Sequence, residues 1–236
     1  MKKVLSFSLW GNIPRYTIGA IKNCELALQF YPDFECWVYI HKDTVPSEIL
    51  EKLNNMSNTK IILKEGNLQE LKPMMWRFLS IDDPEVEINM SRDTDTRILL
   101  REKLAVDEWL SSGKEFHIMR DHPHHMNINT PIMGGMFGTK KIKDIVSWTQ
   151  IINNKKICNS NRPLYDIDQE LLSKNIYPII KNNCFIHSSF GKLLNETHIN
   201  PFPIPFCKNY MFVGGYVYED ESVSEEHTNI IINAIK

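Results

Sequence analysis

Two aspartates separated by one residue, Asp93 and Asp95, have the spacing that most clearly predicts chemistry. Both carboxylates can reach a single divalent cation, and Mg²⁺ and Mn²⁺ prefer such oxygen ligands. Arg92 and Arg97 flank the pair, and guanidinium groups pair well with phosphate oxygens. The segment therefore predicts a site for a metal-bound phosphate. Asp and Thr before a helix are also usual capping residues, so capping is the alternative interpretation.

A second polar segment, residues 117–125, contains four histidines. Arg120 and Asp121 lie within it, and a guanidinium beside a carboxylate can hold sugar hydroxyls or phosphate. We expect this segment to line a sugar pocket, with a solvated loop as the alternative. A zinc site is disfavoured because no HExxH motif and no paired cysteines occur. Further along, Gly134 and Gly135 allow backbone to approach a sugar closely, or they form a turn or bulge.

These residues need a scaffold, and short apolar runs that alternate with helical periodicity predict one. The predicted strands are Val4–Trp10, Cys36–Ile40, Ile61–Leu63, Val86–Met90 and Phe116–Met119. The predicted helices are Tyr16–Phe30, Pro46–Met56, Leu68–Leu79 with an interruption at Pro73, Arg97–Ser112, Ile142–Asn153, Asp168–Ser173 and a short closing helix. This alternation predicts a mostly parallel sheet with helices on both faces. Ligands bind beyond the carboxyl ends of such strands, which is where Asp93 lies.

The segment Asp93-Thr94-Asp95 after a strand resembles the DxD motif of GT-A fold glycosyltransferases. Other segments follow in the order typical of that family. They are the loop Ser8–Arg15, Arg77 in Met75-Trp76-Arg77-Phe78, the Gly-Gly of residues 133–138, the Asp-Gln of residues 166–172, and His187 in Phe185-Ile186-His187-Ser188. One departure is Ser91-Arg92, which stands where many members have an apolar pair.

The resemblance implies a GT-A-like (Rossmann-like) single-domain α/β fold over residues 1–215, followed by an acidic C-terminal extension over 216–236. It implies transfer of a sugar from a UDP- or GDP-sugar donor to a hydroxyl group on a glycan or small molecule. A Mn²⁺ or Mg²⁺ ion is then expected on Asp93, Asp95 and His187. The residues expected to bind the donor are Ser8, Trp10, Gly11, Arg15, Arg77, Arg92 and Asp93.

The sugar and acceptor pocket is expected at Arg120, Asp121, Gly134 and Gly135. Asp168 matches the family's Asp-Gln position and is the expected catalytic carboxylate. In an inverting enzyme it would be the general base, and in a retaining enzyme it would contact the donor sugar. Asp166 and Glu170 are the alternative carboxylates, and Asp168 can also be a helix cap.

The amino-acid composition excludes or disfavours several other classes of protein function. The formal net charge of −2 gives no support for nucleic-acid binding. Five cysteines without a CxxC pair disfavour a disulfide framework and favour a reducing compartment. No apolar stretch is long enough to span a membrane, so we expect a cytoplasmic enzyme of a bacterium or a virus-infected cell. The rival functions are another metal-dependent sugar-phosphate enzyme, such as a nucleotidyltransferase, and a non-catalytic carbohydrate-binding protein.

Overall fold

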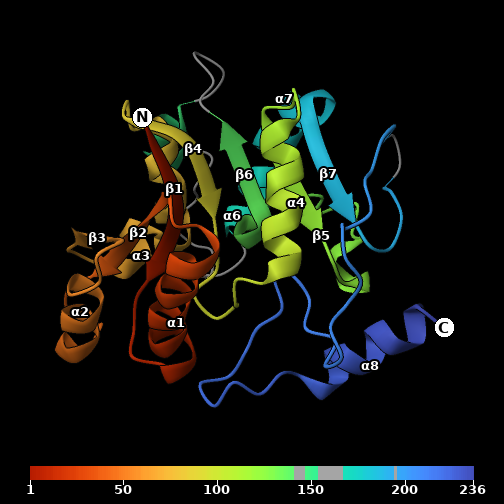
Figure 1. Cartoon of the computed structure of the whole chain (residues 1–236). Coiled ribbons are helices and arrows are strands. Elements are labelled where there is room, and N and C mark those ends of the chain that lie inside the picture. Colours follow the sequence, from red (N-terminus) through yellow and green to blue (C-terminus); the bar gives the residue numbers. More distant parts are fainter. Residues whose placement is uncertain (141–146, 154–166, 194–195) are drawn as a thin grey trace.

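The apolar runs of the sequence form one sheet. The computed structural model describes residues 1–140, 147–153, 167–193 and 196–236, and within them the sheet has seven strands in the order β3-β2-β1-β4-β6-β5-β7 (Figure 1). The strands are β1 Lys2–Leu9, β2 Phe34–His41, β3 Thr59–Lys64, β4 Val86–Ser91, β5 Phe116–Arg120, β6 Phe137–Lys140 and β7 Cys184–Ser188. All neighbours are parallel except the two pairs that involve β6. The five predicted strands are confirmed, whereas β6 and β7 were not predicted.

Alternation along β1 directs its side chains to two faces. Leu5, Phe7 and Leu9 pack in the core that includes helix α1 (Pro14–Phe30). On the other face Ser8 meets the 3-10 helix η1 (Pro73–Asp82), where its hydroxyl accepts a hydrogen bond from the backbone of Arg77 at 3.0 Å. The strand thus brings the end of β1 next to Arg77.

Helices cover both faces of the sheet, as predicted. On one face lie α1, α2 (Ser47–Asn54) and α4 (Leu100–Ser111). On the other lie α3 (Leu68–Leu71), η1, α5 (Trp148–Asn153) and α6 (Ile167–Leu171). Figure 1 shows α4 in front of β5 and β6, with α6 behind them. A π-helical turn (Leu172–Ile176) continues α6 into α7 (Tyr177–Ile180).

Several helix boundaries differ from the sequence prediction. The interruption expected at Pro73 within residues 68–79 is confirmed, because Lys72 is left-handed (φ 48°) and Pro73 follows; what differs is that the second part, η1, is a 3-10 helix. The helix expected from Arg97 begins only at Leu100. Part of the helix expected over residues 142–153 lies outside the described residues. The closing helix is confirmed as α8 (Glu225–Ala234), which Ser224 caps.

The remaining elements are short. Three 3-10 turns, η2 (Pro123–His125), η3 (Gly134–Met136) and η5 (Lys181–Asn183), connect strands to their neighbours. None of the helices described is both long and apolar enough to cross a membrane. The boundary expected between residues 215 and 216 stays a prediction.

Candidate active site

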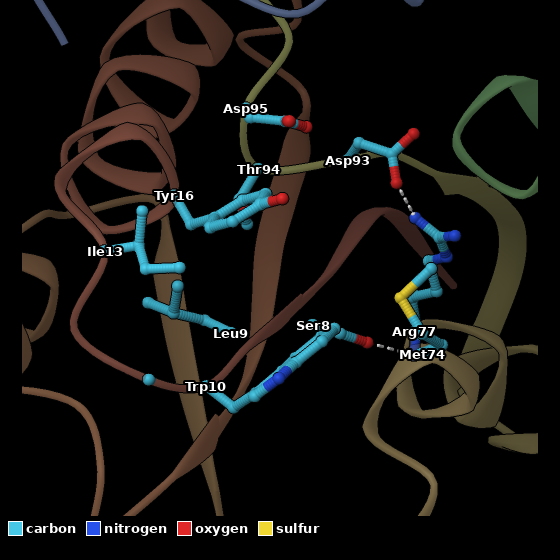
Figure 2. Close-up of a pocket in the computed structure, with 11 residues that line it drawn as sticks. Ser8, Leu9, Trp10, Ile13, Tyr16, Met74, Arg77, Asp93, Thr94 and Asp95 are labelled. Carbon is cyan, nitrogen blue, oxygen red and sulfur yellow. Dashed lines mark hydrogen bonds and ion pairs between the residues drawn. The ribbon is translucent and has the colours of Figure 1, made fainter. Parts of the chain in front are cut away.

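A cavity of about 220 Å³ lies at the carboxyl ends of β1 and β4 (Figure 2). This is the edge at which sheets of this kind bind ligands. Its lining consists of Ser8, Leu9, Trp10, Gly11, Ile13, Tyr16, Met74, Arg77, Asp93, Thr94 and Asp95. Figure 2 shows an apolar side with Leu9, Ile13 and Tyr16, opposite a charged side with Arg77 and Asp93. The residues that were predicted for the site and line the cavity are Ser8, Trp10, Gly11, Arg77, Asp93 and Asp95.

The two aspartates lie in the loop between β4 and α4. The N-cap residue of α4 is Leu99, and no side chain caps that helix. Asp93 and Asp95 therefore do not cap α4, and the capping interpretation is wrong. Within the loop, the hydroxyl of Thr96 donates to the backbone oxygen of Asp93 at 3.0 Å. Both carboxylates are left at the cavity wall.

Helix α1 fixes the backbone of this loop through Asn23, which is buried. The amide nitrogen of Asn23 donates to the carbonyl oxygens of Thr94 at 3.2 Å and Thr96 at 2.8 Å. Its side-chain oxygen accepts from the backbone N–H of Ile98 at 3.1 Å. One turn earlier, a Cβ at Gly19 would overlap the Thr94 carbonyl oxygen. Neither Asn23 nor Gly19 was identified from the sequence, because their partners lie more than 70 residues away.

Arg77 joins two carboxylates at the base of the cavity. Its Nη2 donates to Asp168 at 2.5 Å, and its Nη1 donates to Asp93. Burial opposes the charge of Arg77, but Asp93 and Asp168 together raise its pKa. Asp168 is itself almost fully buried, and burial raises its pKa. The other oxygen of Asp168, Oδ1, is buried without a hydrogen-bond partner among the described residues.

The predicted Gly-Gly segment packs against this cluster. A Cβ at Gly134 would overlap Asp168 and crowd Arg77, and a Cβ at Gly135 would overlap the Asp93 carboxylate. Both glycines are buried and neither is among the cavity residues. The structure therefore gives them a clear role, which is to leave room for the two carboxylates that Arg77 joins.

Asp95 lies beside Arg15, with Nε of Arg15 at 3.4 Å from its Oδ2. Burial, and then the neighbouring charge of Asp93, raise the pKa of Asp95 to about 6. The repulsion between two carboxylates so close together is what a bound cation offsets. Arg15 is in the first turn of α1, so it lies near the cavity although it is not among the lining residues.

Three other predicted site residues lie away from the cavity, each in a buried ion pair. Their charged partners lie between 10 and 76 residues away along the chain. The pairs are Arg92 with Glu102 at 2.6 Å, Arg120 with Glu196 at 2.6 Å, and Asp121 with Arg101 at 2.9 Å. The structure does not bring these three residues to the cavity, and each of their charges has an opposite charge beside it inside the protein.

His187 is not brought together with the two aspartates. It is buried on β7, where its Nδ1 lies 2.8 Å from His117 and its Nε2 lies 3.0 Å from Glu108. Within the described ranges, no group of three or more His, Cys, Asp or Glu side chains is arranged to hold a metal ion. If a cation binds here, the protein ligands that the structure offers are Asp93 and Asp95.

The predicted histidine segment packs against the C-terminal helix. The ring of His122 lies 5.0 Å from that of His227 on α8, and its Nε2 lies 3.2 Å from the His227 backbone oxygen. The centroids of His124 and His125 are 4.8 and 5.7 Å from that of His122. These side chains are not among the residues that line the cavity, contrary to the expectation of a sugar pocket.

The histidine cluster predicts a loss of stability in acid. Burial, and then the neighbouring rings, lower the pKa of His125 to about 3; burial also lowers the pKa of His122 to about 4. The charged or titratable neighbours of the cluster are His124, His227, Arg120 and Glu226. Unfolded histidine binds a proton near pH 6.5, so unfolding gains protons below that pH. From the lowered pKa of His125 alone, we expect the free energy of unfolding to fall by about 2.5 kcal/mol between pH 7 and 4.5, and His122 adds to this loss.

Urea denaturation at several pH values tests this expectation. The matched variant is His122→Asn/His125→Asn, because asparagine can still accept the backbone N–H groups that each Nδ1 accepts now. Its stability should fall less on acidification than that of the wild type. Identical pH dependence in the two proteins would show that these rings do not drive the loss.

Comparison with solved structures supports the fold. The chain is similar to a glycosyltransferase involved in glycosylation of the major capsid of PBCV-1 (TM-score 0.50, 12% identity, covering 80% of this chain and 82% of that one). It is also similar to residues 1–349 of S. aureus TarS (TM-score 0.51, 16% identity, 82% and 59%). A third similar structure is the galactosyltransferase LgtC in complex with donor and acceptor sugar analogs (TM-score 0.49, 12% identity, 78% and 73%). No protein-family model and no curated protein sequence matches the chain.

At these identities the similarity shows the fold alone. The mostly parallel seven-stranded sheet of the described residues, with helices on both faces, is the GT-A-like α/β fold that the sequence predicted.

Proposed function

We propose that this protein is a metal-dependent glycosyltransferase that moves a sugar from a nucleotide-sugar donor to a hydroxyl group of a glycan or small molecule. The observation that carries the proposal is the cavity at the ends of β1 and β4, where an apolar and aromatic side faces two aspartates and an arginine. The fold shared with a glycosyltransferase adds support at the level of architecture. A cytoplasmic location stays a prediction.

The two sides of the cavity suit the two halves of a nucleoside diphosphate. The apolar side, with Leu9, Ile13 and Tyr16, offers apolar and aromatic surface for a UDP or GDP base. The charged side offers Arg77, with Arg15 nearby, for the phosphates. The N-terminus of α1 adds a partial positive charge at the same edge.

A Mn²⁺ or Mg²⁺ ion fits the donor set of this site. Asp93 and Asp95 both line the cavity, and their carboxylates are close enough for the charge of Asp93 to raise the pKa of Asp95. Two carboxylates leave the other coordination positions of a hard cation to phosphate oxygens and water. When bound, the cation supplies positive charge that stabilises the leaving diphosphate.

The residues of the chain have separate roles in this proposal. Arg77 keeps a positive charge beside the diphosphate in a buried setting, where electrostatic stabilisation is strong. Asp168 holds Arg77 through one oxygen and keeps the other, Oδ1, for the transferred sugar or the acceptor. Gly134 and Gly135 leave the space that these carboxylates occupy.

Thermal denaturation with nucleotides tests the proposal. A ligand that binds only the folded protein raises the melting temperature by mass action. We expect UDP or GDP at about 100 times its Kd to raise the Tm by about 5–10 °C in the presence of Mn²⁺, and by much less with EDTA. A panel of UDP- and GDP-sugars, assayed for hydrolysis with Mn²⁺, then identifies the donor. If no nucleotide changes the Tm and no nucleotide sugar is hydrolysed, the proposed function is rejected.

Asp95→Ala isolates the metal site. Because burial raises the pKa of this carboxyl, its charge at pH 7 disfavours the folded state, and we expect the Tm without ligand to stay unchanged or to rise. The Mn²⁺-dependent rise in Tm with nucleotide should disappear. Asp43→Ala is the matched control, since Asp43 is exposed and is not among the cavity residues. A full Mn²⁺-dependent rise in Asp95→Ala would remove Asp95 from the metal site.

A further inference from the structure

The C-terminal part of the chain, around the predicted domain boundary at residues 215 and 216, contacts the loop that carries Asp93 and Asp95. We call residues 213–221 the C-terminal strap. In Figure 1 the blue C-terminal segment passes along the edge of the sheet where β1 and β4 end. Within the strap, the backbone N–H of Val217 donates to the carbonyl oxygen of Asp95 at 2.7 Å. The strap therefore meets the backbone of a residue that lines the cavity.

Both ends of the strap are anchored to buried groups. At one end, the backbone N–H of Val213 donates to Asp121 at 3.0 Å. At the other end, the Glu221 carboxylate accepts from Arg97 at 2.8 Å, and Arg97 also donates to the Thr96 carbonyl at 2.8 Å. Asp121, predicted as a sugar-pocket residue, thus has a different role here, which is to hold the strap.

Between these anchors, Tyr216 contacts Arg15. The guanidinium carbon of Arg15 lies 5.1 Å from the ring centroid of Tyr216 and 4.8 Å from that of Tyr16. Nη2 of Arg15 also donates to the Tyr16 hydroxyl at 2.7 Å. Contacts of a guanidinium with aromatic rings are attractive, and they restrain a long side chain that would otherwise be mobile.

Arg15 is restrained by these rings more firmly than by its acidic neighbour. The 3.4 Å separation from Asp95 is longer than a charge-assisted hydrogen bond, and Nε of Arg15 is buried without a hydrogen-bond partner among the described residues. Nη2 donates to the Tyr16 hydroxyl, whereas Tyr216 contacts the guanidinium through its ring. A guanidinium held in this way keeps donors for an anion.

We propose that Tyr216 is a positioning residue that holds the Arg15 guanidinium for the diphosphate of the donor. This inference rests on the proposed function, and it makes the strap part of the donor site. Tyr216 acts through Arg15, since its own ring is not among the residues that line the cavity. The neighbouring Val217 fixes the Asp95 backbone. Two adjacent strap residues thus position the guanidinium of Arg15 and the carboxylate of Asp95.

Calorimetric titration with a nucleoside diphosphate and with its nucleoside separates this role from a general structural one. The probes are UDP and uridine, or GDP and guanosine, each with and without Mn²⁺. Tyr216→Leu should lose about 5- to 30-fold in affinity for the diphosphate and keep the affinity for the nucleoside. Tyr216→Phe keeps the ring face and should stay within about twofold of the wild type for both.

Two further variants sharpen the test. Phe212→Leu makes the same kind of change in a ring that contacts His122 instead of Arg15, and it should leave the ratio of the two affinities unchanged. In an Arg15→Gln background, Tyr216→Leu should have no further effect on diphosphate affinity. Equal losses for nucleoside and diphosphate, or an unchanged diphosphate affinity in Tyr216→Leu, would overturn the inference alone. Failure of the wild type to bind any nucleoside diphosphate would reject the proposed function with it.

Discussion

Replacing Arg77 with alanine is expected to abolish nucleotide binding and to lower the free energy of unfolding by about 3–5 kcal/mol. Arg77 is buried and donates to Asp93 and to Asp168, which is buried even more completely. Without the guanidinium, the Asp168 carboxylate is left almost fully buried and without the opposite charge that it now contacts. The loss of stability is measured by urea denaturation and the loss of binding by titration with UDP or GDP.

A second substitution separates the two effects. In Arg77→Ala/Asp168→Ala the stranded carboxylate is gone, so much of the lost stability should return while nucleotide binding stays absent. Arg77→Lys keeps the charge but not the planar fork that reaches two carboxylates at once, and it should bind nucleotide about tenfold more weakly than the wild type. Normal stability and normal nucleotide affinity in Arg77→Ala would remove Arg77 from both roles.

The central strands could be predicted because they are buried on both faces. Residues 4–10 and 36–40 form apolar runs that few other structures accommodate. The missed strand β6 is only four residues long and contains Gly138 and Lys140. Its place is set by antiparallel pairing with β4 and β5, which no local pattern reveals. For β7, the sequence analysis predicted His187 as a metal ligand and did not predict that residues 184–188 form a strand.

The start of α4 shows how a distant side chain overrides local preference. Arg97 to Leu99 continue a helical pattern, yet they are not part of the helix. The side chain of Asn23 donates a hydrogen bond to the carbonyl oxygen of Thr96 and accepts one from the N–H of Ile98. These bonds fix the stretch as a loop. The same contact leaves Asp95 at the cavity wall. The position of the metal-binding candidates thus depends on a residue of α1 that carries no recognisable signal.

Which residues line the candidate cavity could be predicted where this depends on the ends of strands, and less so where it depends on charge. Ser8 and Asp93 follow from the rule that ligands bind at the carboxyl edge of the sheet. A charged residue can equally serve a buried ion pair, and the sequence does not show its partner. Arg92 and Arg120 each have a carboxylate partner that only the fold brings near. The contacts of the strap with the loop between β4 and α4 could not be predicted either, because the sequence of residues 216–236 indicates only an acidic extension.

Asp168→Asn is expected to lower the rate of sugar transfer by about 10²–10⁴ while changing donor affinity by less than about tenfold. The amide oxygen can still accept from Arg77, so the contact that orients the guanidinium survives. What is lost is the negative charge and basicity of Oδ1, which is buried without a hydrogen-bond partner in the part of the chain that the structure describes. A carboxylate of this kind acts mainly in the transition state, either by taking the acceptor proton or by stabilising positive charge on the sugar.

The rate of sugar transfer and the affinity for nucleotide must be measured on the same variant. A loss of transfer alone indicates a catalytic role, whereas a loss of both indicates a disturbed site. If Asp168 only holds Arg77, Asp168→Asn should lower transfer no more than it lowers nucleotide binding. Glu170→Gln is the matched control, since Glu170 lies on the same helix and pairs with Lys174 at 2.6 Å. Near-normal transfer in Asp168→Asn would exclude the catalytic role. It would leave Asp166, which lies outside the described residues, as the next carboxylate to replace.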